Sequence, residues 1–199
     1  NAVHWTSHLV LLPVYQQYEP EYVRINPRCV VPTLVCDGKV TTDSANILNY
    51  VVSELSTVDI SEKPSSYEFE AITLWLDKAD SLPIEALTYV DTRGTNKSFL
   101  FKKVADGGKA HEFKANLLRE LIKRHENEKQ LCDAYESKLN IVEDTLKIIQ
   151  TPSRINALYD TADFFLMELE TQLLSGTFNE NGWLASQKFS LADIAWGVV

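Results

Sequence analysis

The feature that most constrains the fold is a strand, turn, strand and helix pattern near the start of the sequence. Thr33–Cys36 is a short, mostly apolar run typical of a β-strand. Asp37-Gly38 follows it and is a strong signal for a two-residue hairpin turn, so we expect Lys39–Thr42 to return as a second, antiparallel strand. Pro32 stands just before the first strand, where it removes no hydrogen bond from the ladder and where a cis peptide bond is acceptable.

A helix is expected directly after this hairpin. Asp43 and Ser44 are both good N-cap residues. They precede apolar residues at helical spacing, which are Ile47, Leu48, Val51, Val52 and Leu55. Unpaired backbone N–H groups at the helix start would lie beside the Ser44 hydroxyl, an arrangement suited to binding a carboxylate. The same two residues also fit a plain helix cap without any ligand.

The spacing of the apolar residues predicts a second, all-helical region. Residues 56–65 mix acidic residues, serines and a proline without any period, which indicates a linker. Beyond it the period is that of a helix. One long stripe comprises Leu131, Tyr135, Leu139, Val142, Leu146 and Ile149, and a second comprises Ile155, Leu158, Ala162, Phe165, Leu169 and Leu173. We therefore expect an α/β domain at residues 1–55 and an all-α domain at residues 66–199.

Composition and charge exclude several classes of function. The 199 residues are 45% hydrophobic and 24% charged, which is ordinary for a globular protein. A net charge of −9 argues against binding nucleic acid, which requires a basic surface. The 3 cysteines lack metal-binding spacing and indicate a reducing compartment. His4 and His8 have no neighbouring ligands in the sequence, and no apolar run is long enough to span a bilayer, so we expect no metal and no membrane segment.

The apolar run Ser7–Leu12, ended by Pro13, predicts a buried parallel strand. A parallel strand needs a neighbour that is reached through a crossover connection. We expect the strand and helix of that connection to precede Asn1. The sequence also ends at Val199 within a helical pattern, so we expect it to be part of a longer chain.

Two groups of residues resemble the glutathione transferase family. V-P-T-L-V at residues 31–35, followed by D-S-A-N-I at residues 43–47, resembles the second half of its thioredoxin-like domain. S-L-A-D at residues 190–193 resembles the capping box of its buried sixth helix. The resemblance covers most of the chain. It implies a thioredoxin-like N-terminal domain that lacks its first strand and helix, followed by a truncated all-helical glutathione-transferase C-terminal domain.

The resemblance also implies a glutathione site. The main chain of Val31, which precedes Pro32, would pair with the cysteinyl amide of glutathione, and Asp43 and Ser44 would hold its γ-glutamyl end. Arg28 is either a contact for the glycine carboxylate or a solvated surface charge.

The second substrate of such a protein is a small electrophile. The resemblance leads us to expect Trp75, Asp80 and Tyr89 near its binding site. The loop after Tyr89 either carries substrate contacts or is plain surface.

The chemistry implied by the resemblance is attack of the glutathione thiolate on the electrophile. In the family a Ser, Tyr or Cys after the first strand favours the thiolate, and we expect that residue to precede Asn1. Cys29 stands where the family pattern has a glycine. Its apolar neighbours, and the lack of a nearby histidine in the sequence, favour a neutral structural thiol over a nucleophile.

Two branches of the family are similar to parts of this sequence. Residues 18–43 are similar to tetrachlorohydroquinone reductive dehalogenases, and Ala79–Tyr89 is similar to ganglioside-induced differentiation-associated proteins. The first branch implies a cytoplasmic enzyme of detoxification that performs conjugation or reductive dehalogenation. The second implies a non-enzymatic protein that acts through protein or membrane partners, held on the mitochondrial outer membrane by an anchor after Val199. The family resemblance implies a homodimer.

Overall fold

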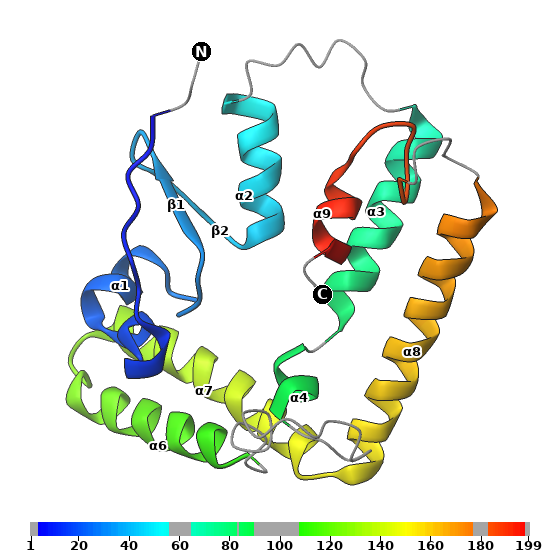
Figure 1. Ribbon diagram of the computed structural model, residues 1–199. Coiled ribbons are helices and arrows are strands. Elements are labelled where there is room, and N and C mark those ends of the chain that lie inside the picture. The colour runs from blue at the N-terminus through cyan, green and yellow to red at the C-terminus, as the bar shows by residue number, and fades with distance from the viewer. Residues whose placement is uncertain (1–3, 56–64, 83, 90–107, 177–182, 198–199) are drawn as a thin grey trace. The chain divides into compact units, whose positions relative to one another are not determined.

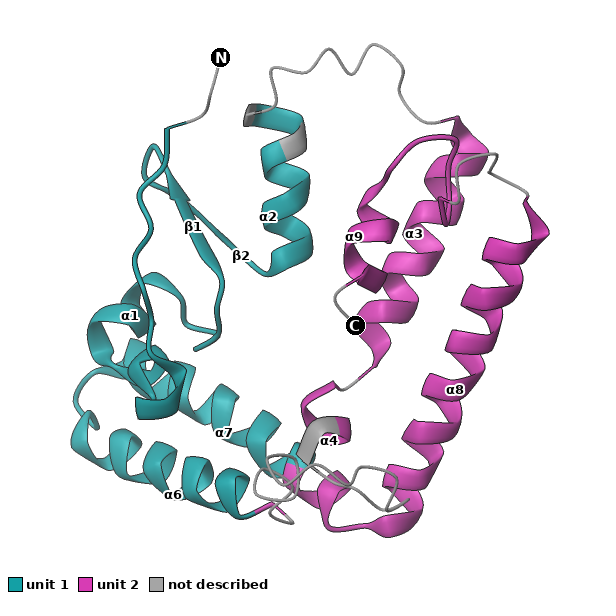
Figure 2. Cartoon of the chain, viewed as in Figure 1, with its two compact units in different colours: residues 1–59, 109–145 teal, residues 60–108, 146–199 magenta. Residues whose placement is uncertain are grey.

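The protein forms two compact units, each built from segments that are distant in the sequence. The computed structural model describes residues 4–55, 65–82, 84–89, 108–176 and 183–197. Unit 1 comprises residues 1–59 and 109–145, and unit 2 comprises residues 60–108 and 146–199 (Figure 2). This division by packing differs from the division along the chain that the sequence predicts. The predicted linker lies almost entirely outside the described residues, and the domain boundaries at 55 and 66 stay a prediction.

Unit 1 joins a small α/β region to a pair of long helices (Figure 1). Its elements are two short 3-10 helices (Leu12–Val14 and Gln16–Tyr18), α1 (Pro20–Ile25), β1 (Thr33–Cys36), β2 (Lys39–Thr42), α2 (Ser44–Tyr50), a π-helical turn (Val51–Leu55), α6 (Lys109–Arg124) and the first part of α7 (Lys129–Ile149).

The predicted hairpin is confirmed. β1 and β2 pair antiparallel, with Thr33 opposite Thr42 and Cys36 opposite Lys39. Asp37 has φ 49° and Gly38 has φ 77°, as a tight hairpin turn with both central residues left-handed requires. The Val31–Pro32 peptide bond is cis.

The strand expected at Ser7–Leu12 is wrong. Residues 4–11 have no regular structure, and the described sheet consists of β1 and β2 alone, so this run has no strand beside it to share hydrogen bonds. Its side chains are correspondingly open to solvent: Leu9 is 79% exposed and Leu11 47%. An apolar run becomes a buried strand only where a neighbour covers both of its faces.

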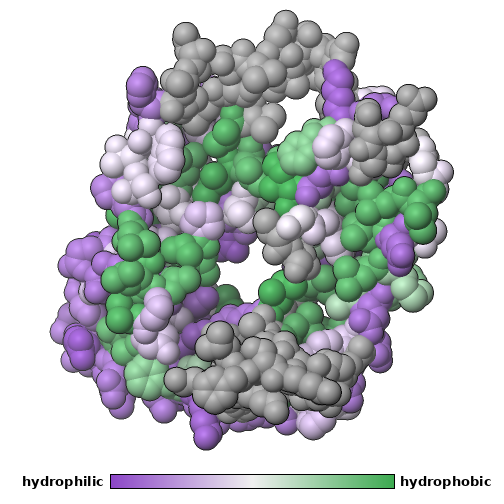
Figure 3. Space-filling model, in the orientation of Figure 1, coloured by the Kyte–Doolittle hydropathy of each residue, from purple (hydrophilic) through white to green (hydrophobic). Residues whose placement is uncertain are grey.

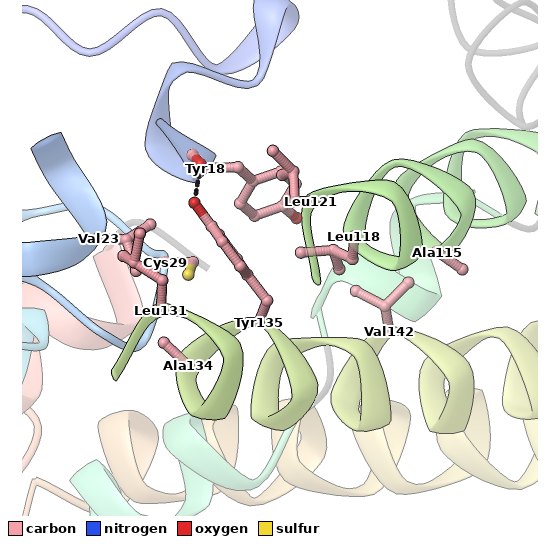
Figure 4. Packing of buried hydrophobic residues seen from close by; sticks show 10 residues of the cluster. All are labelled: Tyr18, Val23, Cys29, Ala115, Leu118, Leu121, Leu131, Ala134, Tyr135 and Val142. Carbon is pink, nitrogen blue, oxygen red and sulfur yellow. Dashed lines mark hydrogen bonds between the residues drawn. The ribbon is translucent and has the colours of Figure 1, made fainter. Parts of the chain in front are cut away.

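The core of unit 1 forms where the N-terminal segment meets α6 and α7 (Figure 4). Its buried members are Tyr18, Val23, Cys29, Ala115, Leu118, Leu121, Leu131, Ala134, Tyr135 and Val142. At its centre the hydroxyl of Tyr135 donates to the carbonyl of Tyr18 over 2.8 Å. Burial raises the pKa of Tyr135 to about 12, so this hydroxyl keeps its proton and remains a donor.

All the regular secondary structure in the described residues of unit 2 is helical. It contains α3 (Ser66–Ser81), α4 (Ile84–Tyr89), the last turn of α7, α8 (Pro152–Ser175) and α9 (Leu191–Gly197). α8 has a proline in its first turn, and Gly176 at φ 65° follows its last residue. Among the described helices of the chain, none is long and apolar enough to cross a membrane.

The two apolar stripes predicted from the sequence differ in how many of their residues are buried. Leu131, Tyr135, Val142 and Ile149 of the first stripe are buried. In the second stripe Ile155 is fully buried, whereas Leu173 is exposed.

A carboxylate ties α9 to the loop that precedes it. Asp193 Oδ2 accepts hydrogen bonds from the backbone N–H of Ser190 at 2.7 Å and from its hydroxyl at 2.8 Å. Oδ1 of the same residue accepts from the N–H of Leu184 at 2.8 Å. Leu184 packs with Trp75 and Ala192 in a core cluster of unit 2. The S-L-A-D sequence therefore both starts a helix and holds part of a core in place.

Replacing Asp193 with alanine should destabilise the protein by about 2 kcal/mol, because it removes the acceptor of three hydrogen bonds and leaves partly buried N–H groups without a partner. Chemical denaturation followed by circular dichroism measures the change. Asp133→Ala is the matched control, because Asp133 pairs with Lys129 at an exposed site and should cost no more than roughly 0.5 kcal/mol. Equal effects of the two substitutions would contradict the role given to Asp193.

Candidate functional site

The two halves of the predicted glutathione motif meet at one end of the hairpin. Thr33 opens β1 and lies opposite Thr42, which closes β2. The residues just outside this pair, Pro32 on one side and Asp43 on the other, therefore flank the same end of the sheet. Among the hydrogen bonds of the described residues, none involves the N–H or the C=O of Val31, which is 38% exposed. The main chain of Val31 therefore offers one donor and one acceptor to an extended ligand.

Asp43 caps α2, as the sequence predicts. Its Oδ1 accepts from the N–H of Ala45 at 3.1 Å, and its backbone adopts φ 79°. Its Oδ2 lies 3.4 Å from a guanidinium nitrogen of Arg28, and both side chains are open to solvent. Ser44 is the first residue of α2 and is exposed. The structure thus brings together Val31, Pro32, Arg28, Asp43 and Ser44, and it places Arg28 against a carboxylate of the protein itself.

Side chains from α1 hold the loop between α1 and β1, and sequence reasoning missed them. The hydroxyl of Tyr22 donates to the carbonyl of Val30 at 2.6 Å and lies 2.8 Å from Thr33 Oγ1. The amide nitrogen of Asn26 donates to the same two atoms, at 2.7 and 2.9 Å. Asn26 is fully buried, and its Oδ1 accepts from the N–H of Arg28. The signal available in the sequence was the Asn-Pro pair at the end of a helical turn, where an asparagine often bonds to the backbone two residues on.

Cys29 is a core residue. It is 1% exposed and lies in the cluster with Tyr18, Val23 and Tyr135. Its φ of 54° is a conformation that glycine adopts more easily, which accounts for the glycine in the family pattern. Burial raises the pKa of the Cys29 thiol to about 11, and a lysine charge from Lys138 opposes this only in part. The thiol is neutral near pH 7 and unsuited to act as a nucleophile.

The residues predicted to contact the electrophile lie in unit 2. Trp75 is buried in a core cluster with Leu184 and Ala192, and its carbonyl accepts from the indole N–H of Trp196 at 2.9 Å. Asp80 is exposed on the same helix. Five residues along α3 place it about 140° around the axis from Trp75. The side chain of Tyr89 and the loop after it lie outside the described residues. The structure therefore does not bring Trp75 and Asp80 together, and the predicted role of Tyr89 stays a prediction.

One edge of Trp75 lines an open groove between α3 and α8. The groove has a volume of about 340 Å³, and its other lining residues are Leu74, Lys78, Met167, Glu168, Thr171 and Gln172. The ammonium of Lys78 lies 4.3 Å from the centre of the Trp75 ring and 3.0 Å from a carboxylate oxygen of Glu168. Both interactions of this lysine are with residues of unit 2.

Among the described residues there is no group of His, Cys, Asp and Glu side chains arranged to hold a metal ion.

The environment of Cys29 predicts its reactivity. At pH 8 a thiol with a pKa near 11 is almost entirely protonated, and only the thiolate is alkylated. Iodoacetamide should therefore modify the half-buried Cys36 well before Cys29 in the native protein, and both at similar rates in denaturant. Peptide mass spectrometry over time measures both rates. Fast native modification of Cys29 would contradict its structural role.

Comparison with known proteins shows that the chain is similar to glutathione transferases and to two kinds of named protein. The sequence model of "Glutathione S-transferase, N-terminal domain" matches residues 2–54. Over 92% of its length the chain is 28% identical to a tetrachloro-p-hydroquinone reductive dehalogenase of Sphingobium chlorophenolicum. Over 95% it is 26% identical to a 2,5-dichlorohydroquinone reductive dechlorinase of Sphingobium indicum. Over 94% it is 24% identical to the human ganglioside-induced differentiation-associated protein 1-like 1.

The chain spans 66%, 61% and 54% of the lengths of these three relatives. A crystal structure of the β-etherase LigF from Sphingobium sp. strain SYK-6 resembles its fold, with a TM-score of 0.58 and 21% identity over 94% of this chain and 68% of that one. The predicted fold class, a partial thioredoxin-like region followed by a helical glutathione-transferase region, is confirmed. The resemblance indicated by the V-P and D-S motifs is confirmed as well: residues 2–54 match the N-terminal domain of the glutathione transferases, and most of the chain is similar to the two bacterial dehalogenating enzymes.

Proposed function

We propose that the protein binds glutathione in unit 1 and transfers its thiolate to a small electrophile. The observation that carries this proposal is the meeting of the two motif halves at one end of the hairpin, with the Val31 peptide group free of partners among the described residues. Val31 would pair with the cysteinyl part of glutathione in the manner of a β-ladder. Asp43 would attract the ammonium of the γ-glutamyl end, and the Ser44 hydroxyl would donate to its carboxylate.

The fit of glutathione to these residues rests on their chemistry. A tripeptide needs a main-chain donor and acceptor beside each other, and Val31 supplies both. Its ammonium group needs a carboxylate, and the Asp43 side chain is 36% exposed and within reach of solvent. Its carboxylates need positive charge or N–H donors, and Arg28 stands next to Asp43. The residue that favours the thiolate is not assigned to any position of this chain.

The thiolate is required because a free thiol, with a pKa of about 8.5, is only a few per cent ionised at pH 7. In conjugation, the thiolate sulfur forms a bond to a carbon of the electrophile and a halide leaves with the bonding electrons. In reductive dehalogenation, a second thiolate attacks the sulfur of that thioether, so the carbon takes a proton and the two sulfurs form a disulfide. Two glutathione molecules are then oxidised for each halide that hydrogen replaces.

The names of the relatives favour chlorinated hydroquinones as the class of electrophile. Two of them are a tetrachloro-p-hydroquinone dehalogenase and a 2,5-dichlorohydroquinone dechlorinase. We extend this class to the present chain as a proposal. Trp75, Asp80 and Tyr89 stay candidate contacts for the electrophile. The similarity to ganglioside-induced differentiation-associated proteins supports the non-enzymatic alternative. The experiments below distinguish this alternative from the proposed enzyme.

A homodimer is part of the proposal. Large apolar side chains are exposed on two helices of unit 2, namely Tyr67, Phe69 and Leu74 on α3, and Phe164, Leu166, Met167 and Leu174 on α8. Figure 3 shows hydrophobic surface in green over α8, at the right of the view. Exposed apolar side chains of this kind are found at protein interfaces. The three cysteines are free, which supports a reducing location such as the cytoplasm.

Loss of the Asp43 charge should weaken glutathione binding by roughly tenfold, because a charge-assisted contact to the ammonium is lost. Asp43→Asn is the sharper variant, because asparagine tolerates the positive φ of this position and keeps the oxygen that caps α2. Asp43→Ala with Ser44→Ala removes the cap as well and should weaken binding further. Isothermal titration calorimetry of the full chain with glutathione measures each affinity.

Asp133→Ala, an exposed acidic residue of α7 in unit 1, is the control and should bind as the wild type does. If a folded Asp43→Asn variant binds glutathione as tightly as the wild type, the site is not where we place it. If the wild type itself shows no saturable binding, the non-enzymatic alternative replaces the proposed function.

Incubation with glutathione and 2,5-dichlorohydroquinone tests the chemistry. We expect chloride release that depends on glutathione and on the protein, and that falls in the Asp43→Asn variant. An ion-selective electrode measures chloride, and a thiol assay measures glutathione. One thiol lost per chloride indicates conjugation, and two indicate reductive dehalogenation. Glutathione binding without any chloride release would exclude this substrate class.

A further inference from the structure

We infer that Tyr22, Asn26 and Thr33 are positioning residues that hold the Val31 peptide group ready for its ligand. The inference rests on the proposed function, since it takes glutathione as the ligand. Val31 itself has no hydrogen bond to the described residues, yet the residues on both of its sides are held. The carbonyl of Val30 accepts from Tyr22 and Asn26, and the hydroxyl of Thr33 contacts the same two side chains.

The hydrogen bonds of this network are concentrated on the main chain around Val31 and Pro32, which indicates a role beyond core packing. Four contacts of 2.6 to 2.9 Å converge on two atoms that lie three residues apart and bracket Val31 and Pro32. Tyr22 lies in the short helix α1 and Asn26 is the C-cap of that helix, which is anchored in the core of unit 1 through the fully buried Val23. Beside the buried Cys29, the network is therefore a second attachment of this loop to the core of its unit.

The chemistry of the network explains why three polar side chains are kept beside a core. The Asn26 amide is fully buried, and burying it without partners would be costly. Its oxygen accepts from the N–H of Arg28, so the same residue also orients the stretch that carries the guanidinium next to Asp43. The network thus links both halves of the proposed site. A loop that is ordered before binding loses less conformational entropy when the ligand arrives.

The test compares variants that remove one hydroxyl each. Tyr22→Phe removes the contacts to Val30 and Thr33, and Thr33→Val removes one hydroxyl without a change in shape. Each should weaken glutathione binding by roughly tenfold in calorimetry. Thr33→Ser keeps the hydroxyl and should restore affinity to within about twofold of the wild type. Tyr159→Phe is the matched control, because it also removes a bond from a tyrosine hydroxyl to a carbonyl, that of Leu87 in unit 2.

A second measurement is made on the protein without ligand. Backbone ¹⁵N relaxation of Val30, Val31 and Thr33 should give order parameters near 0.85 in the wild type and clearly lower values in Tyr22→Phe and Thr33→Val. Circular dichroism confirms that each variant is folded. The expected result is a joint loss of loop order and affinity in these two variants, with neither loss in Thr33→Ser or Tyr159→Phe.

The outcomes separate this inference from the proposed function. If the wild type binds glutathione and Tyr22→Phe and Thr33→Val bind it equally well, the inference is overturned and the proposed function stands. Weaker binding with unchanged loop order also overturns the inference, because the hydroxyls would then affect binding without ordering the loop. If the wild type does not bind glutathione, both are overturned.

Discussion

The pairing of Thr33 with Thr42 is the constraint on which the candidate site depends. A hairpin register is specified by its turn, and here the turn is Asp37-Gly38, with both residues at positive φ. A slip of one residue would exchange the half-buried face of β1, which carries Leu34 and Cys36, with the face that carries the exposed Val35. It would also separate the loop before β1 from the cap after β2. The position of the site is therefore determined by two turn residues at the far end of the hairpin.

Local features of this fold could be predicted from the sequence, because they depend on residues close together in the chain. The hairpin and the Asp43 cap of α2 are both of this kind. The association of α6 and α7 with the N-terminal segment could not be predicted. It depends on contacts such as that between Tyr135 and Tyr18, which are 117 residues apart. Periodicity shows that a helix has an apolar face, but it does not show what covers that face.

The residues of the candidate site also fall into those that could be predicted from the sequence and those that could not. Val31, Pro32, Asp43 and Ser44 were found because each belongs to a short motif. Tyr22, Asn26 and Thr33 were missed because their contacts join a helix, a loop and a strand, and no single residue among them is unusual. Ser7–Leu12 was misassigned because an apolar run is compatible with several structures. Here the described sheet offers it no neighbour.

The Arg28–Asp43 pair shows how charge and binding are related in this protein. The chain carries a net charge of −9, so its overall field repels an anionic tripeptide, and a local positive charge is needed at the site. Arg28 supplies that charge, but at 3.4 Å and in solvent its bond to Asp43 is worth at most about 1 kcal/mol. Opening the pair therefore costs little. In the proposed complex Asp43 exchanges the guanidinium for the ligand's ammonium, and Arg28 exchanges the aspartate for a ligand carboxylate, so neither charge is left without a partner. A ligand that lacks either group would open the pair without replacing it, and this favours a zwitterionic ligand over a simple anion at this end of the hairpin.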